Sequence, residues 1–378
     1  MGAKKKNKKH SWLRTLILLA NWLVLIALLI SYLSPFTHPE TNVVPALLAL
    51  LYPALLLANI LFVVYWIIRW KYYFLFSLIA ILAGYSAFFK TFSFNAEKPV
   101  GSYSDALKVL SYNVRIFDHY KWKSNQNFFI RNSVFDFVNH QQADIICFQE
   151  FFHGNEKSFP TVGPFLENSE AKNYHIDYVI QRGDSKHFGL ATFTRFPIVG
   201  RGNIHFGDKT ANSGIFTDVV FEGDTLRVFN FHLESVKFSK ADYTFVKELS
   251  DPAIVNGSNT KIIVGKLSRA FKSRSAQADV VARYIQESPY PVIVCGDFND
   301  TPLSYVYNTV AEGLNDAFLE TGAGTGASFA GGIPLLRIDY ILHSKSLEAY
   351  RFERHTVDYS DHYPISAYFK SKVSKKNK

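Results

Sequence analysis

Aspartate and asparagine stand two residues apart at the end of an apolar run in PYPVIVCGDFNDTP, residues 289–302. Asp297 and Asn299 follow the run 292–295, which has the length and composition of a buried strand. Acidic and amide side chains are poor strand formers and are costly to bury, so their place at this exit needs an explanation. One explanation is a turn, because Gly, Asn and Asp are ordinary turn residues. The other is a site in which both side chains hold a phosphate or a metal ion.

Further polar residues also end or interrupt apolar runs along the chain: Asn113, Glu150, His232, Asp339, Asp361 and His362. Each has an ordinary explanation when it is considered alone, as a turn residue, a helix-terminal acid or a buried histidine. Their shared placement favours function, since the ends of such strands gather at one edge of an α/β sandwich. Together these residues predict one site.

The predicted site contains what the hydrolysis of a phosphate ester needs. Oxygen ligands from Glu150 and Asn113 suit Mg²⁺ or Mn²⁺, and no Cys/His cluster in the sequence favours zinc. A divalent ion would neutralise charge on a phosphoryl oxygen and on the leaving group. His362 stands beside Asp361 and has Asp339 available as a partner. Such a carboxylate–imidazole pair fixes the tautomer and brings the pKa of the imidazole toward the working pH.

Three side chains of the predicted site remain for the substrate and the water. Asp297 and Asn299 can position the attacking water or hold the phosphate, and His232 is a second imidazole able to donate to the phosphate. No Ser or Cys lies in a nucleophile-elbow sequence, which favours direct attack by water over a covalent intermediate.

Short strands alternating with helices must position these residues. Helices are expected over 125–142 and 271–287, and residues of roughly 236–266 are expected to form an insertion or a lid-like loop. Strands are expected in ALKVLSYNVR ending at Asn113, in ADIICFQE ending at Glu150, in DTLRVFNFHLES ending near His232, and in FGLATFTRFPI, LRIDYILH and SDHYPISAYF.

The N-terminal quarter of the chain has a different composition. Three uncharged apolar stretches, about 15–33, 43–68 and 72–89, are each long enough to cross a bilayer as a helix. A cleavable signal peptide fits poorly, because the first stretch is long and two more follow. The sequence therefore predicts a membrane region over 1–94, a catalytic domain over 105–370 and a basic tail after it, residues 371–378.

Charges that flank these stretches predict an orientation. Six Lys/Arg precede the first stretch, and two more, Arg69 and Lys71, separate the second from the third. The positive-inside rule places the N-terminus in the cytoplasm, and three crossings then place the catalytic domain outside it. A lipid bilayer is thus an expected partner of an integral membrane protein.

The basic charge of the chain is concentrated in the membrane flanks and the tail. Residues 1–98 hold ten Lys/Arg against two Glu, out of a formal net charge of +9 for the whole chain. The remainder has little basic excess for a nucleic-acid backbone, so a nuclease is not favoured.

Seven motifs in this order resemble the endonuclease/exonuclease/phosphatase (DNase-I-like) superfamily: SYNVR, ICFQE, FGLATFTRFPI, FNFHLES, CGDFNDTP, RIDYIL and SDHYPI. The resemblance spans about 107–369. That superfamily includes nucleases, inositol-polyphosphate phosphatases and neutral sphingomyelinases. It implies a four-layer α/β sandwich, with two mixed sheets flanked by helices and the site at one edge. The histidine in FNFHLES departs from the abasic-site repair branch, which argues against DNA repair.

The resemblance also implies roles for the residues at these motifs. Glu150 with Asn113 would form the metal site, and Asp361 would support the metal or the phosphate network. Asp339 would pair with His362 as the general base, and His232 would contact the phosphate. Asp297 and Asn299 would orient water and phosphate.

Three functions are weighed on these observations. The first is a membrane-anchored, Mg²⁺- or Mn²⁺-dependent phosphoesterase acting on a phosphodiester or phosphomonoester, with lipids among the candidate substrates. The second is a membrane-tethered nuclease, for which Lys261, Lys266, Arg269, Lys272 and Arg274 would supply a basic stripe, although they are better explained as the solvated face of a helix. The third is a non-catalytic membrane module with the same fold, which is disfavoured because the set of site residues is complete.

Overall fold

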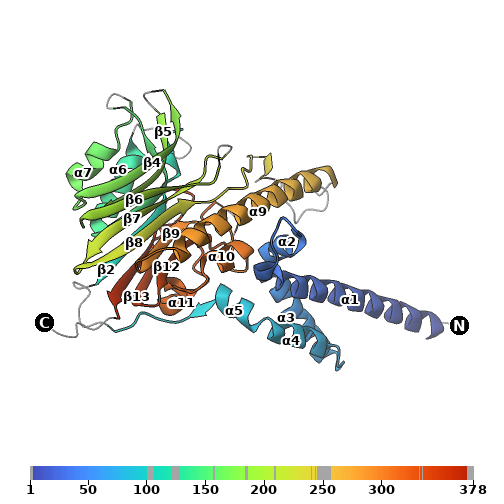
Figure 1. Cartoon of the computed structure of the whole chain (residues 1–378). Coiled ribbons are helices and arrows are strands. Elements are labelled where there is room, and N and C mark those ends of the chain that lie inside the picture. The colour runs from blue at the N-terminus through green and yellow to red at the C-terminus, as the bar shows by residue number, and fades with distance from the viewer. Residues whose placement is uncertain are drawn as a thin grey trace.

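The computed structural model describes residues 3–99, 106–120, 128–155, 158–183, 186–207, 210–239, 241–242, 244, 257–331, 333 and 335–372. Two six-stranded sheets pack face to face, helices cover their outer sides, and the N-terminal helices project away from one end (Figure 1). The predicted α/β fold, with two mixed sheets flanked by helices, is confirmed.

The first sheet has the strand order β13-β14-β2-β3-β5-β4. β2 and β3 pair in parallel, and the other neighbours pair antiparallel. The strands are β2 (Leu107–Asn113), β3 (Ile145–His153), β4 (Asn173–Arg182), β5 (Lys186–Thr194), β13 (Leu347–Arg354) and β14 (Ile365–Ser371).

The second sheet repeats this plan, in the order β10-β12-β9-β8-β7-β6. Here β8 and β9 are the parallel pair. The strands are β6 (Ile198–His205), β7 (Ser213–Phe221), β8 (Asp224–His232), β9 (Val292–Asp297), β10 (Leu314–Asp316) and β12 (Asp339–Ser344). A separate short ladder joins β1 (Ser93–Phe94) to β11 (Ala323–Gly324).

Three apolar cores hold the layers together. The central core lies between the sheets and includes Val109, Val228 and the free cysteines Cys147 and Cys295. The outer face of the first sheet packs against α6 (Phe129–Gln141) and α7 (Val162–Asn168). The outer face of the second packs against the end of α9 (Gly257–Gln286) and against α10 (Tyr305–Val310). The remaining short elements of this part are η3 (Arg115–Asp118) and α11 (Ala317–Thr321).

Two sequence expectations about these elements are wrong. β3 does not end at Glu150 but continues to His153, because a bulge between Phe148 and Phe151 interrupts its pairing with β5 and lets the strand resume. α9 starts at Gly257, so the last part of the expected 236–266 loop is helical. Residues 240, 243 and 245–256 of that segment lie outside the described residues.

The N-terminal helices differ from three straight spans. They are α1 (Ala3–Ser31), η1 (Ser34–Phe36), α2 (Val44–Leu50), α3 (Tyr52–Ile68), α4 (Phe74–Ala83) and α5 (Tyr85–Thr91). In the described residues one helical stretch, Trp12–Phe36, is long and apolar enough to cross a membrane. The pairs α2–α3 and α4–α5 bend by 72° and 63°, and the number of spans rises to three only if each bent pair is one span.

Both bends have local causes in the sequence. A proline lies in the first turn of α3, where a residue without an N–H can start a helix but cannot continue the one before it. Gly84 separates α4 from α5, and a Cβ there would lie 2.1 Å from the Tyr32 hydroxyl. The expectation of three transmembrane helices is therefore not confirmed by helix length and composition alone.

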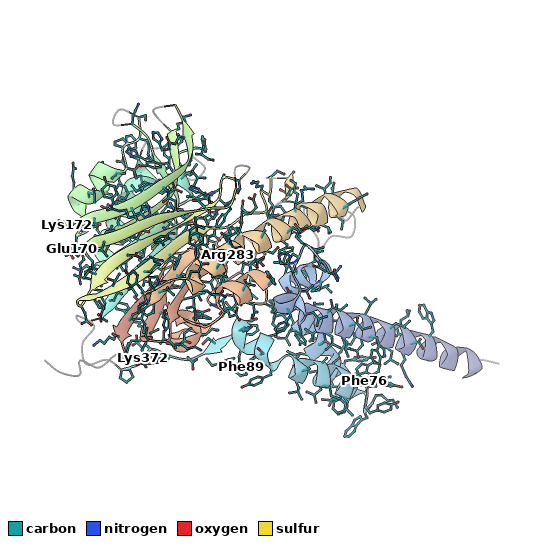
Figure 2. All side chains as sticks on the ribbon, viewed as in Figure 1. Phe76, Phe89, Glu170, Lys172, Arg283 and Lys372 are labelled. Carbon is teal, nitrogen blue, oxygen red and sulfur yellow. The ribbon has the colours of Figure 1, made fainter. Side chains whose placement is uncertain are left out.

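The N-terminal helices carry apolar residues on the outside, and a few polar residues lie buried among the apolar ones inside. Leu23 and Ile79 are 72% and 62% exposed. In the interior, the buried Asn21 donates to Ser77 Oγ at 2.7 Å and accepts from Trp66 Nε1 at 2.9 Å. Figure 2 shows Phe76 on α4, away from the sheets, and Phe89 on α5, nearer to them. Such an exterior is costly in water and suits hydrocarbon.

Arg337 is a buried cation where α5 meets the sandwich. Its Nη1 donates to Asp316 Oδ2 at 2.6 Å and its Nη2 donates to the carbonyl oxygen of Lys90 at 3.0 Å. Asp316 also accepts from the Tyr307 hydroxyl at 2.8 Å. The Arg337–Asp316 pair thus connects the sheet, α10 and the N-terminal helices.

We expect Asp316→Asn to lower the free energy of unfolding by about 3–5 kcal/mol, because it leaves a buried guanidinium without its counter-charge. Chemical denaturation of the full chain in detergent measures this. Lys272→Ala breaks a partly exposed pair with Glu40 and is the control, with an expected loss of less than about 1 kcal/mol. Equal losses in the two variants would contradict a structural role for the buried pair.

Candidate active site

His362 and Asp339 form a buried ion pair at the edge of the sandwich. Asp339 is the first residue of β12, and His362 lies in the loop before β14. The His362 Nδ1–Asp339 Oδ2 distance is 2.9 Å, and His362 Nε2 lies 3.6 Å from Asp297 Oδ2. Burial acts to lower the pKa of His362, but the carboxylates of Asp339 and Asp297 hold that pKa well above its ordinary value. The geometry therefore stabilises an imidazolium.

Asp297 is the carboxylate at the centre of the site. Its Oδ2 accepts a hydrogen bond from Asn113 Nδ2 at 3.0 Å, and its Oδ1 accepts one from the backbone N–H of Asn299 at 2.8 Å. The side chain is 1% exposed, and burial raises the pKa of Asp297 to about 6, against the lowering influence of His362. This carboxylate can thus exchange a proton near neutral pH.

Glu150 reaches the site because of the bulge in β3. Its φ of +51° lies in the left-handed region, and the altered backbone places its carboxylate beside Asn113, whose Nδ2 donates to Glu150 Oε1 at 3.2 Å. Burial raises the pKa of Glu150, and the nearby Asp361 carboxylate raises it further. Asp361 is paired in turn with Arg115 of η3, with a Nε–Oδ2 distance of 3.3 Å.

His232, the last residue of β8, faces the same carboxylates. Its Nε2 lies 3.7 Å from Glu150 Oε1 and 3.6 Å from Asp297 Oδ2. That nitrogen is buried, and no group of the described residues hydrogen-bonds to it. Burial lowers the pKa of His232, so its ring stays neutral under conditions in which His362 is charged. A phosphate oxygen is the kind of partner that the nitrogen lacks.

Asn299 holds the turn that follows β9. Its φ is +53°, a conformation that asparagine tolerates better than most residues. Its Nδ2 donates to the carbonyl oxygen of Leu233 at 3.0 Å, which ties the ends of β8 and β9 together. The structure therefore supports both explanations of the GDFND segment, a turn and a site.

All of the residues that the sequence analysis assigned to a site lie at this one edge. It is formed by the carboxyl ends of β2, β8 and β9, by the bulge of β3 and by the amino ends of β12 and β14. The residues are Asn113, Glu150, His232, Asp297, Asn299, Asp339, Asp361 and His362.

Two groups of side chains in this edge could hold a metal ion. Asp297, Asp339 and His362 offer ligand atoms within 4.8 Å of one another. His362 already bonds to Asp339 there, which satisfies that group without a cation. Glu150 and Asp361 repel each other electrostatically beside the amide of Asn113, and a hard divalent cation would relieve that repulsion. The oxygen donors of this second group fit Mg²⁺ or Mn²⁺, although Asn113 turns its Nδ2 toward Glu150 and its Oδ1 accepts from Arg115 N–H.

Several supporting residues could not be identified from the sequence. Ser360 donates from Oγ to the Asn113 carbonyl at 2.8 Å and accepts from His362 N–H at 3.2 Å. Ser328 Oγ accepts from Asp339 N–H at 3.0 Å. A serine next to the Asp361-His362 motif gave a weak signal for Ser360, whereas nothing in its own segment marks Ser328.

Arg274 does not belong to a solvated helix face, contrary to the sequence expectation. It is 1% exposed, its Nε donates to Asp300 Oδ2 at 3.2 Å, and its Nη1 donates to the carbonyl oxygen of Glu234 at 2.9 Å. It thus clamps the segments that follow β8 and β9. Lys266 and Lys272 of the same helix pair with Asp242 and Glu40.

A cavity of about 270 Å³ opens beside the candidate catalytic residues. Glu150 and His232 line one side of it, together with Ser213, whose buried Oγ has no hydrogen-bond partner among the described residues. Five apolar residues also line the cavity, Ile116, Val179, Ile180, Phe188 and Leu190, and so does the cationic Lys237. The cavity can therefore receive a group with an apolar body next to a bound phosphate.

A family model described as "Endonuclease/Exonuclease/phosphatase family" matches residues 110–362. The chain belongs to this family. The resemblance seen in the seven sequence motifs is confirmed, and the site described above lies entirely within the matched residues. A second model, described only as a domain of unknown function, matches residues 14–91. No curated protein matches the chain.

Solved structures of similar fold include the human Nocturnin catalytic domain with bound sulfate anion, at 20% identity and a TM-score of 0.52 over 71% of this chain and 95% of that one. An endonuclease/exonuclease/phosphatase family protein from Bacteroides thetaiotaomicron matches at 18% identity and a TM-score of 0.52, over 70% and 97% of the two chains. A mannosyl-6-phosphatase from the same species matches at 18% and 0.50, over 70% and 99%. At sequence identities this low, the structural similarity shows a shared fold and nothing more.

We expect Asp297→Asn to stabilise the protein in metal-free buffer at neutral pH. An unfolded aspartate ionises near pH 4, whereas the folded Asp297 holds its proton up to about pH 6. The wild type therefore loses stability relative to the variant as pH rises from about 4 to 6. Above pH 6 the variant should be more stable by about 2–3 kcal/mol, and below pH 4 the two should agree. Denaturation curves at several pH values measure the difference, and a difference independent of pH would show that the Asp297 pKa is not raised.

Proposed function

We propose that the protein is a divalent-metal-dependent phosphoesterase that hydrolyses a phosphodiester or phosphomonoester by direct attack of water, and that its N-terminal helices hold it in a membrane. Family membership supports hydrolysis of a phosphate ester. The observation that carries the proposal is the buried cluster of Asp297, His362 and Asp339, in which a carboxylate with a pKa of about 6 lies 3.6 Å from a charged imidazole.

The two histidines would hold the phosphate from different sides. His362, charged and fixed by Asp339, would stabilise the negative charge that builds on the phosphoryl oxygens. His232 would donate from its unpartnered Nε2 to another oxygen of the same group. Asn299, whose backbone N–H donates to Asp297 Oδ1, would help to orient the water through that carboxylate.

Asp297 is the better candidate for the group that removes a proton from the attacking water. A general base works best when its pKa lies near the working pH, which fits the raised pKa of Asp297. The pKa of His362 is raised as well, and a raised pKa keeps the proton on an imidazole, so the Asp339–His362 pair would act as a fixed cation and, later, as a proton donor to the leaving oxygen. The sequence predicted this pair as the base. A raised pKa makes the carboxylate of Asp297 more basic but leaves the imidazole of His362 protonated, which favours Asp297 as the base instead.

Glu150, Asp361 and Asn113 would hold the Mg²⁺ or Mn²⁺ ion. When bound, such an ion neutralises charge on the phosphoryl group and the leaving oxygen. Arg115, which pairs with Asp361, would keep that carboxylate oriented.

The cavity beside Glu150 and His232 supports a lipid-derived substrate over a nucleic acid. Its apolar wall suits an alkyl or acyl group more than a charged backbone. The basic stripe that a nuclease would need is largely absent from the described part of α9, since Arg274 is buried and Lys266 and Lys272 have acidic partners. A non-catalytic module would not need so complete a set of buried ionisable groups.

Hydrolysis by the full chain purified in detergent tests the proposed reaction. Sphingomyelin- and phosphatidyl-type lipids, inositol phosphates, plasmid DNA and a chromogenic phosphodiester would be offered with Mg²⁺ or Mn²⁺ and with a chelator. We expect turnover of a phosphate ester that the chelator abolishes. Turnover of DNA alone would establish the tethered nuclease instead, and no turnover with any metal would support the binding module.

Substitution of the site histidine should remove that activity. We expect His362→Ala to lower kcat/KM by about 10²–10⁴-fold, the range for loss of an acid–base group. The matched control is His355→Ala, because His355 contacts Ser366 and Phe137 outside the site. Thermal unfolding of both variants separates lost chemistry from lost structure. Equal activity of the two variants would contradict the assigned role.

The packing of the N-terminal helices supports three crossings and an active site on the side opposite to the N-terminus. Arg14, near the start of the apolar stretch Trp12–Phe36, donates to the hydroxyl of Tyr73, so the basic turn before α4 lies beside the N-terminal end of that stretch. The loop after α1 instead contacts the sandwich, with 3.3 Å between His38 Nε2 and Asp279 Oδ2, and β1 pairs with β11. Together with the positive-inside rule, these contacts support a catalytic domain outside the cytoplasm.

Labelling of introduced cysteines tests this orientation, because Cys147 and Cys295 are buried and should not react. Trp70 is 92% exposed in the turn before α4, and Glu222 is exposed between β7 and β8. In intact cells, a membrane-impermeant maleimide should label Glu222→Cys but not Trp70→Cys, and both should react after lysis. If only Trp70→Cys were labelled before lysis, the catalytic domain would lie in the cytoplasm and the proposed orientation would be wrong.

A further inference from the structure

The loop that carries Asp297 and Asn299 ends inside the packing of the N-terminal helices. From β9 the chain continues through Asp300 to Leu303, and Ser304 then caps α10 by accepting from the N–H of Tyr307 at 3.0 Å. Residues 297–304 are called the catalytic loop below. Leu303 is 3% exposed and belongs to an apolar cluster whose other buried members come from α1 to α5: Leu25, Leu28, Ala49, Tyr52, Leu56, Ala80 and Ala87.

The first half of the catalytic loop is held by the sandwich. Asp300 pairs with Arg274, and its carbonyl oxygen accepts from the Tyr340 hydroxyl at 2.9 Å. Phe298 is fully buried against the second sheet. The second half of the loop is held by the N-terminal helices instead. Leu303 packs on them, and α10, which follows the loop, packs on η1. The loop thus bridges the two parts of the protein.

The conformation of the catalytic loop needs support at both ends. Asn299 has a positive φ, and its backbone N–H and side chain both hold neighbouring groups in place. Asparagine tolerates this conformation, but both hydrogen bonds keep their geometry only while the backbone of the loop stays in place. Leu303 lies four residues farther along a short, tight connection, so movement of Leu303 would be transmitted to Asn299 and to the carboxylate of Asp297.

Polar contacts fix the helices on the sandwich around Leu303. The Tyr305 hydroxyl donates to Asp279 Oδ1 at 2.7 Å, and His38 lies 3.3 Å from the other oxygen of the same carboxylate. Lys90 Nζ donates to Asn308 Oδ1 at 2.9 Å on α10. The loop after η1 and the end of α5 therefore both contact the sandwich close to the segment that follows the catalytic loop.

We propose that Leu303 is a positioning residue through which the N-terminal helices hold Asp297 and Asn299 in their working geometry. The N-terminal helices are then part of the catalytic unit as well as its anchor. The test by activity rests on the proposed phosphoesterase function, whereas the loop geometry can be tested without it.

Leu303→Ala in the full chain tests the proposal, with a soluble chromogenic phosphodiester as substrate so that access to a bilayer plays no part. We expect kcat to fall by about 10–100-fold with KM changed less than threefold, because misplaced groups weaken the transition state more than substrate binding. Leu303→Met keeps most of the side-chain volume and should restore kcat to within about threefold of the wild type.

The matched control is Leu226→Ala. Leu226 is 4% exposed in the core between the sheets, at the start of β8 and away from the site. The substitution removes the same atoms from a buried place, so it should lower the unfolding temperature while kcat stays unchanged. If Leu226→Ala lowers kcat as much as Leu303→Ala, general destabilisation explains both and the proposal is overturned.

Hydrogen exchange provides a readout that does not depend on activity. Backbone amides of residues 298–304 should exchange at least tenfold faster in Leu303→Ala than in the wild type, and should be unchanged in Leu226→Ala. Unchanged exchange of these amides in Leu303→Ala would overturn the proposal. If Leu303→Ala does not fold, the milder Leu303→Val serves in both measurements. A wild type without activity but with the expected exchange pattern would refute the proposed function and leave the positioning role supported.

Discussion

A buried hydrogen bond from the Asn113 amide to the Asp297 carboxylate joins the two sheets at the edge where the candidate catalytic residues lie. Each partner is the last residue of a strand in a parallel pair, β2 in one sheet and β9 in the other. Below this bond, Gln149 of β3 donates to Asn230 of β8 at 2.7 Å. These contacts fix the distance between the sheets, and with it the separation of the groups that each sheet contributes.

Burial and neighbouring charges give the two histidines opposite properties. Both are buried, which disfavours a charged ring in each case. His362 has the Asp339 carboxylate at 2.9 Å and a second at 3.6 Å, whereas the acids nearest to His232 lie at 3.6 and 3.7 Å. One direct hydrogen bond to a carboxylate thus separates a cationic histidine from a neutral one. The same surroundings raise the pKa of Asp297 to about 6. Asp297, His232 and His362 are therefore neighbours that bind a proton with different affinities.

Much of this arrangement could be predicted from the sequence, because an apolar run that ends in a polar residue marks both a strand and its exit. That rule placed the ends of β2, β8 and β9 correctly, and parallel strands bring their carboxyl ends together. Glu150 was identified as a site residue because it was expected to end a strand, which it does not. It reaches the site through a bulge in a strand that continues, and a bulge depends on pairing with another strand that the local sequence does not contain.

Other features depended on contacts between distant segments. Arg274 has the spacing of an exposed helical residue and is nevertheless buried, because Asp300 and the carbonyl of Glu234 meet it from two loops. The helical bends at α3 and Gly84 were visible as Pro and Gly in the sequence, but their angles follow from packing among the helices. Ser328 supports Asp339 from a segment without any catalytic motif. Side chains that complete a site through tertiary contact carry no periodic or compositional signal.

Apolar side chains of the N-terminal helices face two different surroundings, the outside of the protein and its interior. Those directed outward, such as Leu23 and Ile79, have no partner cluster in the sandwich and suit a lipid environment. Those directed inward form the cluster that receives Leu303. Because the polar contacts of His38, Lys90 and Arg337 surround the inward contact, the helices cannot pivot freely about a flexible linker. Helices docked in this way fix the direction in which the catalytic edge faces relative to them, so that under the proposed membrane attachment the edge would keep one orientation toward the bilayer.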